Sequence, residues 1–170
     1  MQNSEKHRKN LSYLTIFIAA FIIISASFMR QLMNFAKIYT GEKGFISLIG
    51  LILLTGGISF LIWTLKTKPS LIRTLGIITI LAVGLFLAWQ IKIVVERIHI
   101  LEYGVLGWFV SRDLRSKKFR GIILACLFTT IVGIIDEGFQ AVLPYRFFDL
   151  RDILFNSLGG IWGIFLYLLS

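Results

Sequence analysis

The chain has 170 residues, of which 56% are hydrophobic, and a formal net charge of +9 at pH 7. With a mean hydropathy of +0.81, it cannot be a water-soluble domain; we expect an all-α polytopic membrane bundle, with about six transmembrane spans of ~20 residues in a single domain over residues 1–170. The basic residues flank apolar runs, as anchoring at a membrane surface requires, so we expect no nucleic-acid partner.

Three apolar runs fill the first half of the chain. The first, 11–29, follows a basic start, but it is long for a signal peptide and has a poor cleavage site, so we predict an uncleaved span. Residues 30–44 are predicted to be a loop, with aromatic side chains suited to a membrane interface. Runs 45–65 and 71–90 predict the second and third spans, separated by a tight basic turn.

The fourth predicted span, 94–111, is irregular because its first half is polar. It contains Glu96, Arg97, His99, Glu102 and Tyr103. A strongly basic loop, 112–120, follows it and is typical of a cytoplasmic connection. With six spans, eleven Lys and Arg residues fall on the side of the N-terminus and seven on the other. This asymmetry predicts a multi-pass protein with both termini in the cytoplasm.

The last two apolar runs, 120–135 and 153–169, predict a hairpin with a polar head. Glu137 and Gln140 lie three residues apart and share a helix face. Arg146 falls in the turn, where we expect it to pair in a bidentate manner with Asp149, Asp152 or Glu137.

The second helix of this hairpin begins after Pro144, which ends the first. Asp149 is predicted to cap it, and Asp152 and Asn156 lie four residues apart on one of its faces. Further along, Gly159 and Gly163 form a ridge of small residues that lets another helix approach closely.

Spans four, five and six bring their polar ends to the same outer level. Six of the nine acidic residues fall in this layer: Glu96, Glu102, Asp136, Glu137, Asp149 and Asp152. Charge is costly in hydrocarbon, so these faces should turn toward one another and form an outward-facing pocket. The candidate catalytic residues are Glu137, Asp136, His99 and Glu102. The candidate substrate-binding residues are Arg146, Gln140, Asp149, Asp152, Asn156 and Tyr103.

Two simpler interpretations of these residues stay open. The charged head can be a structural ion-pair knot that pins the hairpin. A divalent metal on Glu96, His99 and Glu102 would use the Glu-x-x-His spacing of di-iron bundles, but only one such helix is present. The single cysteine, Cys126, lies within a span and excludes a disulfide or a cysteine metal cluster. We therefore expect no metal and no cofactor.

The polar residues also carry a family resemblance. The run His99-Ile100-Leu101-Glu102-Tyr103, with Leu106-Gly107 after it, resembles the first motif of the VanZ-like family of bacterial membrane proteins. The second motif of that family is matched by Glu137, Gln140, Pro144, Arg146, Asp149, Asp152, Asn156 and Gly159-Gly160. Together the motifs cover about residues 94–165. Many members have a lysine three residues before the histidine, where this chain has Glu96.

The resemblance implies the bacterial cytoplasmic membrane and a role in the cell envelope, because members are similar to a protein associated with resistance to the glycopeptide teicoplanin. Two functions follow as hypotheses. In the first, the pocket binds a polar group of a membrane lipid, a lipid-linked glycan precursor or a membrane protein partner. In the second, the chain is a membrane-embedded enzyme that uses carboxylate acid/base chemistry, with Arg146 neutralising an anionic substrate. No residue reads as an activated nucleophile, which favours the first.

Overall fold

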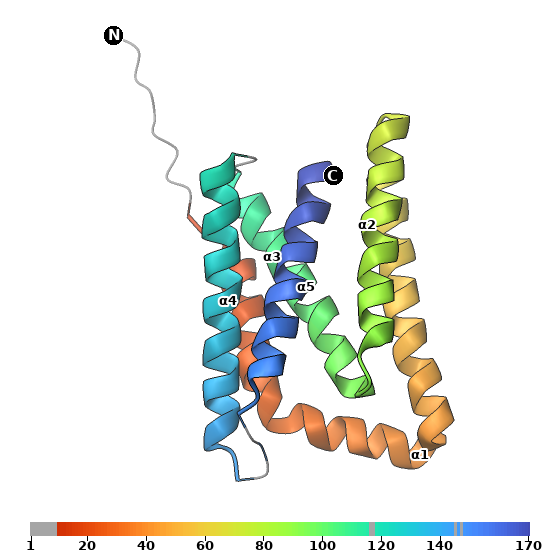
Figure 1. The fold of residues 1–170 in the computed structure, drawn as a ribbon, viewed down its shortest axis with the longest axis vertical. Helices are drawn as coiled ribbons and strands as arrows, with labels where there is room; N and C mark the ends of the chain where they lie inside the picture. The colour runs from red at the N-terminus through yellow and green to blue at the C-terminus, as the bar shows by residue number, and fades with distance from the viewer. Residues whose placement is uncertain (1–9, 116–117, 145, 147) are drawn as a thin grey trace.

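The computed structural model describes residues 10–115, 118–144, 146 and 148–170. In those ranges its regular secondary structure is entirely helical (Figure 1). The elements are α1 (Tyr13–Leu65), α2 (Leu71–Gln90), the 3-10 turn η1 (Val94–Glu96), α3 (Arg97–Leu114), α4 (Phe119–Val142) and α5 (Leu150–Leu169). Four of the helices, α1, α2, α4 and α5, are long and apolar enough to cross a membrane. The predicted all-α membrane bundle is confirmed, whereas the count of six spans stays a prediction.

Helix α1 contains both of the first two predicted spans. Its 53 residues would extend about 80 Å if straight, far more than a bilayer requires. The helix is broken at Gly41, whose φ of 69° is a conformation that glycine adopts without steric cost, so α1 consists of two helices joined at this residue. Figure 1 shows a first arm (13–29), a crossing segment (30–44) at the lower end of the bundle, and a second arm (45–65) that rises beside α2.

The prediction of a loop at 30–44 was therefore wrong. No proline interrupts α1, and the crossing segment packs Met33 and Ala36 against the buried Phe45 and Ile49 of the second arm. Aromatic side chains on its other faces, such as Tyr39, are exposed and suit a membrane interface, as predicted. The polarity of residues 30–44 is compatible both with a loop and with a helix at the membrane interface, so it could not distinguish the two.

The most polar helix, α3, is the central one. It packs against each of α1, α2, α4 and α5, and the side chains of Tyr103, Leu106 and Val110 are 0% exposed. The structure starts this helix at Arg97, after the η1 turn, within the predicted fourth span. Because these neighbours bury much of its surface, α3 can carry polar side chains on its covered faces without presenting them to lipid.

Helices α3 and α5 cross at glycines. A Cβ on Gly107 would overlap the carbonyl oxygen of Gly160, and a Cβ on Gly163 would overlap that of Gly104. The predicted close approach at the Gly159–Gly163 ridge is therefore present, and the approaching helix is α3. This crossing fixes the height of α3 against α5 and so the relative height of their polar residues.

The predicted hairpin is formed by α4 and α5. Helix α4 ends at Val142, two residues before Pro144, as the restriction on residues preceding proline requires. Asp149 is the N-cap of α5, and its side chain accepts a hydrogen bond from the backbone N–H of Arg151 at 2.8 Å. Both features agree with the prediction.

At the upper end, Asp113 of α3 forms hydrogen bonds with the start of α1. Its Oδ2 accepts hydrogen bonds from the backbone N–H and the hydroxyl of Ser12, at 2.7 and 2.6 Å, and from the hydroxyl of Thr15 at 2.5 Å. Its Oδ1 accepts from Arg112 at 2.8 Å. The carboxylate is largely buried, and its hydrogen bonds from these donors stabilise the contact between the first arm and α3.

The two ends of the bundle differ in charge. The upper end, where α1 and α4 start and α5 ends, has one described acid, Asp113. Its described basic residues are Lys66, Lys68, Arg73, Arg112, Arg115, Lys118 and Arg120. The lower end holds all the other described acids. The positive-inside rule counts Lys and Arg alone, and seven of them are described at each end, so the prediction that the upper end faces the cytoplasm comes from the full-sequence count of eleven against seven. Four further basic residues of the predicted cytoplasmic side, in segments 1–9 and 116–117, lie outside the described residues.

We expect single cysteines to report this orientation in a Cys126→Ala background. In intact cells, a membrane-impermeant thiol reagent should label cysteines at Lys37 and Lys92, which are exposed at the lower end, and should not label one at Lys68. The sequence predicts the same for Tyr145, which should be labelled, and for Ser116, which should not; both positions lie outside the described residues. Labelling at Lys68 but not at Lys37 would reverse the orientation.

Candidate functional site

The predicted site residues gather at the lower end of the bundle. Helix α3 supplies three of them from its first two turns, α4 supplies three from its last two turns, and α5 with the loop before it supplies the rest. We call the following residues the polar cluster: His99, Glu102, Tyr103, Asp136, Glu137, Gln140, Arg146, Asp152 and Asn156. The α3–α5 crossing and the hairpin hold these segments at one level.

Glu137 lies at the centre of the cluster and is 0% exposed. Its Oε1 accepts a hydrogen bond from the side-chain amide of Gln140 at 3.0 Å, and its Oε2 accepts one from the backbone N–H of Asp149 at 3.2 Å. The carboxylate thus ties the end of α4 to the start of α5. This is the structural role that the ion-pair interpretation assigned to the head of the hairpin, although here it uses hydrogen bonds.

Arg146 does not form the predicted bidentate pair with a carboxylate. Its guanidinium donates a hydrogen bond to the side-chain oxygen of Gln140, and the side-chain N–H of Gln140 donates to Glu137. Arg146 therefore reaches Glu137 through Gln140. Burial, and then the neighbouring positive charge of Arg30, lower the pKa of Arg146.

Asp136 and Tyr103 form a second buried contact, between α4 and α3. The Tyr103 hydroxyl donates to Oδ2 of Asp136 at 3.1 Å, and the two residues are 0% and 1% exposed. The Oδ1 atom of Asp136 has no hydrogen-bond partner among the described residues. One turn earlier on α3, Nδ1 of His99 lies 3.6 Å from a carboxylate oxygen of Glu102.

Asn156 and Asp152 face the cluster from α5. Asn156 is 0% exposed, and its Cβ lies 3.1 Å from where a side chain on Gly133 of α4 would begin. Neither atom of its amide finds a partner in the described part of the chain, and the same holds for Oδ1 of Asp152. Buried polar atoms are almost always hydrogen-bonded in folded proteins, so these groups are available to water or to a ligand.

Asp149 joins the cluster only through its backbone. Its side chain caps α5 and forms an ion pair with Arg151 at 2.6 Å, and these hydrogen bonds lower its pKa. The side chain is therefore engaged with its own helix. For Asp149, the predicted role in binding a substrate through its side chain has no geometric support.

A small cavity of about 30 Å³ opens beside the cluster. Five of the predicted site residues line it: His99, Glu102, Asp136, Gln140 and Arg146. Other lining residues come from α1 and include Ser25 of the first arm and Arg30 at the start of the crossing segment. In the sequence, Arg30 is only a single charge that follows the first predicted span, which is a weak signal for a site residue.

The carboxylates and histidine are not arranged as a metal site. In the described ranges, no group of three or more His, Cys, Asp or Glu side chains is positioned to hold a metal ion. The metal site weighed on Glu96, His99 and Glu102 therefore has no support in the geometry. Hydrogen bonding and charge are the properties that this arrangement offers to a ligand.

The chain matches a known protein family. The family model described as VanZ/LLP1 matches residues 10–170, well beyond the two motifs at about 94–165. No curated protein and no solved structure matches the chain.

Proposed function

The chain belongs to the VanZ/LLP1 family, and from this premise we propose that it is a bacterial envelope protein of the cytoplasmic membrane whose polar cluster binds a ligand. The ligand is an anionic or polar group of a membrane lipid or a lipid-linked glycan precursor, presented at the outer membrane face. By holding such a group, the protein would alter susceptibility to glycopeptides such as teicoplanin. Alternatively, the polar cluster binds the same kind of anionic or polar group on a membrane protein partner.

The observation that supports binding is the pair of arginines at one cavity. Arg30 of α1 and Arg146 of the α4–α5 loop both line it, and the charge of the first lowers the pKa of the second. Like charges held close together favour an anion between them, and guanidinium groups bind phosphate and carboxylate with paired hydrogen bonds. Asp136 lines the same space, and its Oδ1, which has no partner among the described residues, is an acceptor for a ligand hydroxyl or amide that reaches it.

The size of the cavity limits what enters it. About 30 Å³ admits a group of water size, so only the tip of a headgroup can reach Asp136. The rest of the ligand would lie outside, at the lower end of the bundle. This favours recognition of a small terminal group over enclosure of a whole substrate.

A membrane-embedded enzyme is the second candidate, and the adjacent carboxyls favour it. Asp136 and Glu137 are 1% and 0% exposed, and two neighbouring buried carboxyl groups resist joint ionisation. Such a pair can hold one proton and pass it to a bound group as general acid/base catalysis requires, with Arg146 neutralising the anion of the substrate.

Arginine variants test the proposal. We expect Arg30→Gln and Arg146→Gln to reduce the glycopeptide susceptibility phenotype to that of a deletion strain, because each lost charge-assisted hydrogen bond lowers ligand affinity by roughly tenfold or more. Arg151→Gln is the matched control, since Arg151 is exposed and pairs only with Asp149 among the described residues. Full activity of both cavity variants at normal membrane levels would contradict the proposal.

Lipid analysis separates the two candidates. Membranes from cells with and without the gene are compared for lipid-linked precursors. A binding protein leaves the precursor pool unchanged, whereas an enzyme leaves an accumulated substrate in the deletion strain and a product in the other. If cells that carry the Glu137→Gln variant accumulate the same substrate as the deletion strain, the reaction depends on the polar cluster.

A further inference from the structure

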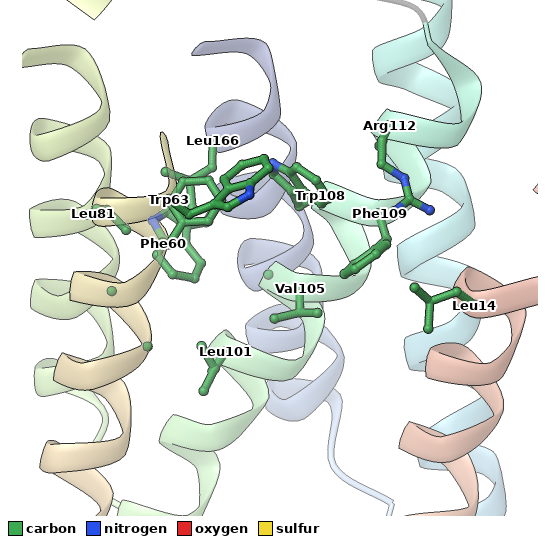
Figure 2. Close-up of a pocket in the computed structure, with 14 residues that line it drawn as sticks. Leu14, Phe60, Trp63, Leu81, Leu101, Val105, Trp108, Phe109, Arg112 and Leu166 are labelled. Atoms are coloured by element: carbon green, nitrogen blue, oxygen red, sulfur yellow. The ribbon is translucent and has the colours of Figure 1, made fainter. Parts of the chain in front are cut away.

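A second, larger cavity of about 660 Å³ lies between the two arms of α1 and extends along α3 from Leu101 to Arg112, and it shares no lining residue with the small cavity at the polar cluster. Figure 2 shows Leu101, Val105, Trp108 and Phe109 of α3 projecting toward the space between Leu14 of the first arm and Phe60 and Trp63 of the second. We call this space the groove. Among the described residues that line it, Arg112 is the charged one, and it lies at the upper end.

The groove exists because the two arms of α1 do not meet. The crossing segment holds them apart at the lower end, so α3 is left uncovered between them. Gly56 and Gly57 add no side chains to fill the space, and nothing lies within 4 Å of where a Cβ on Gly57 would be. An unfilled apolar space forfeits dispersion contacts on every wall, so an occupant would stabilise the bundle.

We propose that the groove binds one acyl chain of an anionic glycerophospholipid, with its phosphate beside Arg112. The length of the groove supports a lipid chain. From Leu101 to Arg112, α3 rises on the order of 16 Å, which is about half the hydrocarbon thickness of a bilayer. A single leaflet is that deep, whereas a partner helix would need a groove across the full thickness.

Charge complementarity supports an anionic headgroup. The upper end, where the groove ends, has seven described basic residues and one acid. Arg112 is held in place by Asp113 and lies over the ring of Phe109, with its guanidinium carbon 4.5 Å from the ring centroid. This positions a cation where the headgroup of a lipid in the groove would lie, with Arg115 and Lys118 nearby in the chain.

Tryptophan fluorescence tests the proposal, because Trp63, Trp108 and Trp162 line the groove and the fourth tryptophan, Trp89, does not. The full-length Trp89→Phe protein is placed in phosphatidylcholine nanodiscs that contain a small fraction of phosphatidylglycerol with dibrominated chains. We expect this lipid to quench the tryptophan fluorescence as strongly as if it were enriched about fivefold around the groove. An enrichment of about fivefold is the effect of one basic residue on an anionic lipid. Dibrominated phosphatidylcholine at the same fraction should quench only in proportion to its abundance.

Gly57→Leu, made in the same background, should fill the groove and remove the excess quenching. Gly50→Leu is the matched control, because Gly50 lies on the same arm, has open space around it and does not line the groove. If Gly57→Leu does not fold, Val105→Trp fills the groove from α3 and is read by native mass spectrometry of retained phosphatidylglycerol. Equal quenching by both brominated lipids, or excess quenching that survives the filled groove, would overturn the proposal.

Discussion

Replacement of Gly163 by alanine is expected to lower the free energy of unfolding by about 3 kcal/mol, the upper part of the range for overpacking a close contact. The added Cβ would overlap the backbone carbonyl of Gly104, and backbone at a helix crossing cannot turn aside as a side chain can. The helices must separate, and the polar residues of α3 and α5 then lose their common height.

Gly138→Ala is the control for this substitution. Gly138 lies within α4, and nothing is within 4 Å of where its Cβ would be. Alanine there should stabilise the helix by about 0.5–1 kcal/mol. The measurement is thermal or denaturant unfolding of both variants in the same detergent. Equal stability of the Gly163→Ala and wild-type proteins would show that α3 and α5 are farther apart than the structure has them.

Glu137→Gln should abolish the envelope phenotype while the protein still folds and inserts. The amide keeps the shape of the carboxyl group but carries no charge and holds no transferable proton. It can accept from Gln140 or from the backbone N–H of Asp149 but not from both, which costs about 1 kcal/mol. The assay is glycopeptide susceptibility at matched membrane levels, with the exposed Glu42→Gln as the control.

Glu137→Ala separates the structural role from the functional one. It leaves two donors, the Gln140 amide and the Asp149 N–H, without their acceptor, at about 1–3 kcal/mol each if they stay buried. We expect that variant to be unstable as well as inactive. A Glu137→Gln protein with full activity would leave Glu137 only the role of joining α4 to α5.

The hairpin and the level of the polar residues follow from the sequence alone. Pro144 limits α4, Asp149 caps α5, and the spacing of Glu137 and Gln140 places them on one face. These are local properties, because helix geometry converts spacing into depth and direction within a few residues. The cost of polar groups in lipid then turns such faces inward, which is why a convergence of α3, α4 and α5 could be predicted.

The partners of these residues were decided by the tertiary structure. Arg146 donates to Gln140, where the spacing predicted a carboxylate, and Arg30 reaches the cavity from a helix that begins more than a hundred residues earlier. The helical conformation of the crossing segment up to the break at Gly41 and the groove between the arms of α1 are likewise not local. The periodicity of a sequence determines which face of a helix is buried, but it does not determine which helix packs against that face. Close packing, such as that of Gly163 against Gly104, decides this.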